Sequence, residues 1–128
     1  MMVLTIREII ALHEKLTIST GGASGLRDIG LLESAVLGCY QSFGGMDLYP
    51  TITEKAARIA YALSKNHPFI DGNKRVAVSA MIVMLRMNGV NLRHTQQELI
   101  ELGLSIADGS IDYGDILAWV HAHITLTP

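Results

Sequence analysis

The chain is organised around the stretch His67-Pro68-Phe69-Ile70-Asp71-Gly72-Asn73-Lys74-Arg75 and the apolar run Val76–Leu85 that follows it. The segment from Lys74 to Met87 is apolar nearly all round, which predicts a helix buried at the centre of a bundle. Asn88 and Gly89 supply its C-terminal stop. Because Pro68 disfavours helical backbone at the residue before it, a preceding helix should end there. We therefore expect the other helices to pack around this central one.

Five further helices are predicted from capping residues followed by apolar side chains at helical spacing. The pairs Thr5 with Glu8, Thr51 with Glu54 and Thr95 with Glu98 have the spacing of a capping box. The predicted helices run from Thr5 to about Leu16, from Asp28 through Cys39, from about Thr51 to about Ser64, from Thr95 to about Ala107, and from about Asp112 onward.

The fold class expected from this pattern is all-α, a single compact helical bundle of about six helices in one domain, 1–128. Gly44, Gly45 and Pro50 predict a loop, and no segment shows the alternation typical of strands. Val90–Leu92 is at most a short extended piece. The single cysteine, Cys39, lies in an apolar run and is expected in the core.

The composition excludes several classes of function. Ten basic and twelve acidic residues give a formal net charge of -2, and no basic run suggests direct nucleic-acid binding. The apolar run Val76–Leu85 is far shorter than the roughly 20 residues that cross a bilayer. No standard signal peptide begins the chain. We expect a cytoplasmic protein with no membrane association.

The residues just before the central helix are those that phosphate chemistry needs. A helix N-terminus has unpaired N–H groups and a partial positive charge, so a glycine turn there can hold a phosphate by its amides. Gly72 and Asn73 form this turn, and Lys74 and Arg75 add positive charge, Arg75 through a planar fork. The turn therefore predicts a phosphate-binding site.

Three more residues complete the candidate site. Asp71 offers hard oxygen ligands suited to Mg²⁺, which commonly bridges substrate phosphates. Histidine is the side chain that most often accepts a proton near neutral pH, so His67 is a candidate base for an attacking hydroxyl. Phe69 should anchor the loop in the core. Taken singly, each residue also has an ordinary structural interpretation, as a loop histidine, a turn or a solvated first helical turn.

The whole segment resembles the Fic/Doc signature, commonly written H-x-F-x-D/E-G-N-x-R. Its fixed positions are matched by His67, Phe69, Asp71, Gly72, Asn73 and Arg75. The stretch Gly21–Ala35 is also similar to the N-terminal region of Doc-type members. The resemblance implies the helical Fido fold and a toxin of a toxin-antitoxin system, death-on-curing (Doc) type.

The resemblance also implies a role for each matched residue. His67 would deprotonate the target hydroxyl, Asp71 would hold Mg²⁺, and Gly72 with Asn73 would form the anion hole. Arg75 would bind phosphate, and Phe69 would be the structural anchor.

Two positions bear on the subclass. AMP-transferring Fic enzymes usually have glycine and a second arginine where this chain has Lys74 and Val78, and both changes resemble the Doc branch. That branch implies kinase activity, in which Lys74 would help transfer the terminal phosphate of ATP or another nucleoside triphosphate to a Ser/Thr hydroxyl of elongation factor Tu or a similar target. Gly72 is the Fic-like residue, so AMP transfer remains an alternative, and a catalytically inactive binding module is another.

A separate antitoxin is the other expected partner. Self-inhibited Fic proteins share an S/T-x-x-x-E-G/N helix, and this sequence lacks that pattern. Doc-type toxins are silenced by a protein whose C-terminal segment folds on them. We therefore expect a Phd-like antitoxin to bind with a helical segment in an apolar groove near the motif.

Overall fold

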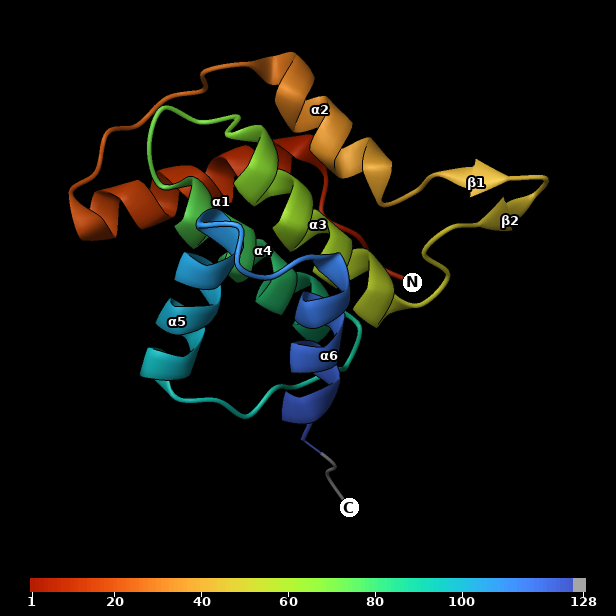
Figure 1. Cartoon of the computed structure of the whole chain (residues 1–128). Coiled ribbons are helices and arrows are strands. Elements are labelled where there is room, and N and C mark those ends of the chain that lie inside the picture. Colours follow the sequence, from red (N-terminus) through yellow and green to blue (C-terminus); the bar gives the residue numbers. More distant parts are fainter. Residues whose placement is uncertain (126–128) are drawn as a thin grey trace.

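The computed structural model describes residues 1–125, and its elements are six helices and one small hairpin (Figure 1). They follow the chain in the order α1 (Ile6–Thr20), α2 (Ile29–Gly38), β1 (Ser42–Phe43), β2 (Met46–Asp47), α3 (Ile52–Asn66), α4 (Asn73–Met87), α5 (Gln96–Ala107) and α6 (Tyr113–His123).

Five of the six helices begin at a capping side chain, and this explains where they start. In each, a side-chain oxygen of the cap residue accepts a hydrogen bond from a backbone N–H in the first turn. The cap residues are Thr5, Asp28, Thr51, Thr95 and Asp112. The three capping boxes read from the sequence are confirmed. Helix α4 is the exception, and its first turn belongs to the motif.

Helix α4 lies at the centre of the bundle, as expected. It packs against α3, α5 and α1, and nine of its fifteen residues are buried. Met81, Met84 and Leu85 are fully buried, together with Ile59 and Leu63 of α3. The all-α helical bundle is confirmed.

The structure differs from the sequence-based expectations in two places. Helix α1 continues past Leu16 to Thr20, where the hydroxyls of Ser19 and Thr20 donate hydrogen bonds to carbonyls one turn back and Gly21 ends the helix in a left-handed conformation. The expected loop around Gly44 and Gly45 is a β-hairpin in which both glycines have positive φ. The expectation of no strands was wrong here, because two residues per strand are too few to show alternation.

The last helix is joined to α5 by a charged contact. His123 stacks on Trp119 and lies 3.0 Å from a carboxylate oxygen of Glu98. Leu92 and Ile124 form a single β-bridge, which is the short extended piece expected near Val90–Leu92. Cys39 is fully buried, as expected. Within residues 1–125 no helix has both the length and the apolar character needed to span a bilayer.

Candidate active site

His67 stands at the C-terminal end of α3 in a backbone conformation that is unusual for its type. Its φ of 50° and ψ of 55° are left-handed, and among the described residues it is the one non-glycine residue with positive φ. The guanidinium of Arg27 donates hydrogen bonds to the carbonyls of Asn66 (3.0 Å) and His67 (2.7 Å). Such a backbone costs on the order of 1 kcal/mol, and these bonds help to hold it in place.

Phe69 anchors the motif loop, as expected. Its ring is 1% exposed and stacks on the imidazole of His13 with 3.8 Å between ring centroids. The buried amide of Asn73 accepts a hydrogen bond from the Phe69 N–H at 3.0 Å and donates one to the Phe69 carbonyl at 2.9 Å. The Asn73 side chain therefore shapes the loop, and its backbone belongs to the turn.

His13 is a site residue that the sequence analysis did not find. It is 2% exposed, and its Nε2 lies 2.6 Å from the carbonyl oxygen of Asp71. Because a carbonyl can only accept, Nε2 carries the proton and donates it. His13 thus holds the backbone of Asp71 just before Gly72. In the sequence, its spacing of one helical turn from other core residues of α1 was the only sign that it is buried.

The loop after α1 is bound to the motif loop by backbone hydrogen bonds. The N–H groups of Arg27 and Asp28 both donate to the carbonyl of Pro68, at 2.7 and 3.0 Å. The N–H of Ile70 donates to the carbonyl of Gly25 at 3.1 Å. These bonds fix the motif loop against a second segment of chain about forty residues earlier.

The N-terminus of α4 is open to a ligand. Gly72 precedes the helix with φ 77° and offers no side chain to cap it, whereas the other five helices of the described chain have a side-chain cap. The first turn of α4 carries Lys74 and Arg75 and no acidic residue. Cations there oppose the helix dipole unless an anion is bound nearby. The geometry is that of an anion site.

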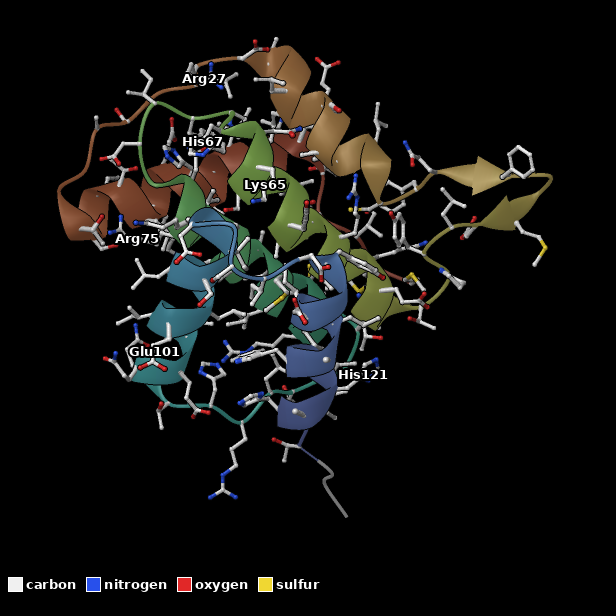
Figure 2. All side chains as sticks on the ribbon, in the orientation of Figure 1. Arg27, Lys65, His67, Arg75, Glu101 and His121 are labelled. Atoms are coloured by element: carbon white, nitrogen blue, oxygen red, sulfur yellow. The ribbon has the colours of Figure 1, made fainter. Side chains whose placement is uncertain are left out.

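A cavity of about 520 Å³ lies in front of this N-terminus. Figure 2 shows where the labelled side chains of His67, Arg75 and Arg27 lie relative to the motif loop. The structure brings six of the seven predicted site residues into the wall of this cavity, and Phe69 lies buried behind it. The six are His67, Asp71, Gly72, Asn73, Lys74 and Arg75.

The exposed carboxylate of Asp71 is the candidate metal ligand. Its Oδ1 accepts a hydrogen bond from the Gly72 N–H at 2.8 Å, and its Oδ2 accepts a long one of 3.4 Å from Ala23. Each oxygen keeps a lone pair for another partner. No group of three or more metal-ligating side chains occurs in residues 1–125. A lone carboxylate fits Mg²⁺, which commonly takes one or two carboxylates with waters and phosphates.

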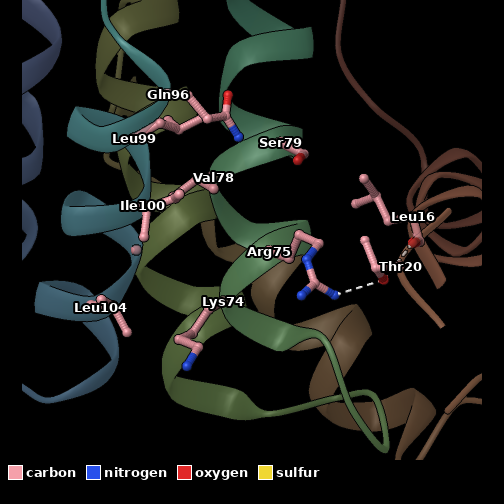
Figure 3. A pocket seen from close by; sticks show the side chains of 11 residues that line it. Leu16, Thr20, Lys74, Arg75, Val78, Ser79, Gln96, Leu99, Ile100 and Leu104 are labelled. Atoms are coloured by element: carbon pink, nitrogen blue, oxygen red, sulfur yellow. Dashed lines mark hydrogen bonds between the residues drawn. The ribbon is translucent and has the colours of Figure 1, made fainter. Parts of the chain in front are cut away.

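The two cations of the first turn lie on different sides of α4. Figure 3 shows Arg75 directed toward α1, where its Nη1 donates to the hydroxyl of Thr20 at 3.0 Å. Lys74 is directed away from Thr20, toward α5. Both line a second cavity of about 540 Å³ between α1, α4 and α5, whose wall includes the half-exposed Ile100 and Leu104. An apolar groove therefore adjoins the motif.

The chain is similar in sequence to known proteins. The chain is 42% identical over 76 residues to "Toxin Doc" of Mycolicibacterium smegmatis, covering 59% of this chain and 58% of that protein. It is 32% identical over 109 residues to "Protein kinase doc" of Escherichia phage P1, covering 85% of each. Residues 3–85 match the model of the Fic/DOC family, so they include α1 and the complete motif. The chain belongs to the Fic/DOC family.

Proposed function

We propose that this chain is a Doc-type toxin, a protein kinase that transfers the terminal phosphate of ATP or another nucleoside triphosphate to a Ser/Thr hydroxyl of a protein target. The observation that carries the proposal is the uncapped N-terminus of α4. It meets the exposed His67, the carboxylate of Asp71 and two cations in one cavity. The name of the phage relative supports the kinase assignment.

The cavity can bind and orient a phosphate without rearrangement of the backbone. The N–H groups at the start of α4 have no side-chain cap and residues 72–75 line the cavity, so phosphate oxygens can accept hydrogen bonds from them. The guanidinium of Arg75, held by Thr20, offers further donors to oxygens on which negative charge increases during transfer. These groups position the terminal phosphate.

The transfer itself needs one proton acceptor. The imidazole of His67 accepts the proton of the target hydroxyl as its oxygen forms a bond to the terminal phosphorus. The bond from that phosphorus to the bridging oxygen breaks, and the nucleoside diphosphate leaves with the bonding electrons. The hydrogen bonds from Arg27 to the backbone at His67 hold the base at the edge of the cavity.

Asp71 would hold Mg²⁺ in this proposal, because its carboxylate is exposed and both of its oxygens keep an acceptor position. When bound, the ion would neutralise phosphate charge. His13 holds the backbone carbonyl of Asp71, and the Gly72 N–H donates to the carboxylate itself, so the two bonds fix its position.

The direction of the nucleotide decides which group is transferred. Lys74 lines both the motif cavity and the adjoining groove, so its side chain occupies space beside the turn and offers a point charge there. This supports binding with the terminal phosphate next to His67. The alternative, AMP transfer, is favoured by Gly72, which matches the Fic signature at this position.

ATP labelled at both the gamma phosphate and the adenine separates these activities. With elongation factor Tu as the proposed target, the kinase passes the gamma label to the protein, and the intact mass rises by one phosphate. Transfer of the adenine label would show AMP transfer instead. If neither label is transferred to any protein of a cell extract, the chain is an inactive binding module. Because translation takes place in the cytoplasm, modification of a translation factor would support the proposed cytoplasmic location of this chain.

A cognate Phd-like antitoxin is the second proposed partner. The groove between α1, α4 and α5 shares Thr20, Lys74 and Arg75 with the motif cavity. A helical segment with apolar side chains lying over Ile100 and Leu104 would reach the phosphate site from the side. Its binding would block the nucleotide and raise the thermal stability of the toxin by mass action.

A further inference from the structure

One face of α3 carries cations and an aromatic ring outside the motif. Arg58, Tyr61, Ala62 and Lys65 are spaced at i, i+3, i+4 and i+7, so they lie along one side of the helix. Together with Ser34 of α2 and Asn66 they line a cavity of about 180 Å³. None of the residues of this cationic face is assigned to phosphate transfer. The face lies on α3, the helix that ends just before His67.

The charges on this face are only partly balanced within the described chain, where hydrogen bonds from Ser110 and, to a smaller extent, the charge of Lys65 lower the pKa of the exposed Asp108. No acidic side chain lines the cavity, and neither Arg58 nor Lys65 forms an ion pair with any of residues 1–125. The Nε of Arg58 is buried and has no acceptor among these residues. Tyr61 lies between the two cations. The centroid of its ring is 5.6 Å from the guanidinium carbon of Arg58 and 5.7 Å from Nζ of Lys65. The face therefore presents donors and positive charge to an anionic group.

The cationic face leads directly to the proposed base. Helix α3 ends at Asn66, which lines the small cavity, and the next residue, His67, lines the motif cavity. Figure 2 shows Lys65 and His67 at this same end of α3. Lys65 also approaches Gly109 in the α5–α6 connection, and Ala107, two residues earlier, lines the motif cavity. The two cavities thus have neighbouring rims.

We propose that the face formed by Arg58, Tyr61 and Lys65 is a docking site for an acidic side chain of the protein target, next to the hydroxyl that is modified. The inference rests on the proposed transfer to a protein. Carboxylates match the two cations in charge, and a carboxylate can accept from an arginine and a lysine at the same time. Contacts of this kind select partners and speed encounter.

The helix geometry limits where the acidic residue lies in the target. Nine residues separate Arg58 from His67, which corresponds to about 13 Å along the helix axis. An extended target segment rises about 3.3 Å per residue and spans this length with about four residues. The target therefore carries an Asp or Glu within about four positions of the modified Ser or Thr.

Steady-state kinetics with purified elongation factor Tu and ATP test the docking site. Lys65→Glu should raise the KM for the protein about tenfold, while kcat and the KM for ATP stay within about twofold of the wild type. Lys15→Glu is the matched control, because it makes the same charge change at an exposed position that lines none of the three cavities. Arg58→Gln should act in the same direction without a reversal of charge. Equal KM values for Lys65→Glu and the control would overturn the docking site.

A binding measurement makes the inference testable without transfer. The anisotropy of fluorescein-labelled hexaglutamate should report binding to the wild type and at least fivefold weaker binding to Lys65→Glu, with no change for Lys15→Glu. Absence of binding to the wild type, or equal affinity for all three, would refute the docking site. Peptide binding that depends on Lys65, without transfer to elongation factor Tu, would retain the docking site and reject the proposed target.

Discussion

Replacement of His13 by phenylalanine tests the hydrogen bond by which this side chain holds the motif loop. A phenyl ring keeps the stacking on Phe69 but has no donor for the Asp71 carbonyl, which now accepts from Nε2 at 2.6 Å. Because His13 is 2% exposed, water has little access to replace the lost bond. The variant therefore isolates one hydrogen bond.

The expected magnitude follows from the unsatisfied acceptor. A buried polar group left without a partner costs about 1–3 kcal/mol, so His13→Phe should lower the free energy of unfolding by that amount. His13→Ala also removes the stacked pair with Phe69, which adds about 0.5–1.5 kcal/mol. Movement of the Asp71 and Gly72 backbone should weaken ATP binding by about tenfold, which corresponds to about 1.4 kcal/mol.

Urea unfolding and titration calorimetry with ATP and Mg²⁺ measure the two effects. His121→Phe is the control, since His121 is exposed and makes no hydrogen bond with the described residues, and it should stay within about 0.5 kcal/mol of the wild type. If His13→Phe matches the control in both stability and ATP affinity, His13 does not hold the motif.

Four further outcomes are expected. His67→Ala should lower the rate of phosphate transfer by about 10²–10⁴-fold and leave urea unfolding unchanged, and a rate close to that of the wild type would reject His67 as the base. Asp71→Ala should remove the Mg²⁺ dependence of ATP binding in a calorimetric Mg²⁺ titration, and an unchanged dependence would remove Asp71 from the metal role. Hydrogen bonds from the Thr95 backbone and from His123 lower the pKa of Glu98 to about 2, while bonds to the Trp119 carbonyl and Glu98 raise the pKa of His123 above 6.5. The stability lost in Glu98→Gln should thus be greatest between pH 4.5 and 6.5. The loss should shrink below that range as Glu98 protonates, and above it as His123 deprotonates. A difference in stability between the variant and the wild type that does not change with pH would contradict the contact. Leu104→Glu should stop the cognate antitoxin from rescuing growth on co-expression, and full rescue would place the antitoxin elsewhere.

Local signals in the sequence were sufficient to predict most of the helices. A capping box depends on residues three positions apart. Thr5 and Thr51 could therefore be recognised as helix caps from the sequence alone. The end of α1 was harder, because Ser19 and Thr20 are polar and do not continue the apolar spacing by which the helix was recognised. The hairpin at Ser42–Asp47 was missed because its strands are too short to show a period.

The site was predictable where its residues are consecutive. The motif from His67 to Arg75 contains the candidate base, ligand and phosphate-binding groups in one run. His13 was not predictable, because its partner Asp71 lies 58 positions later and nothing in the local pattern joins them. The same holds for Thr20, which bonds to Arg75 across 55 positions. Long-range contacts of this kind depend on the packing of α1 against α4.

These long-range bonds also bear on the order in which the candidate site assembles during folding. The helices can form early from local contacts, whereas the motif is held by α1 and its loop across 48 to 58 positions of chain. Contacts between distant residues close late and slow folding, because a long loop loses entropy before they form. Under the proposed function, a newly made or partly digested chain without a docked α1 would carry the motif but lack the bonds from His13 and Thr20 that hold Asp71 and Arg75.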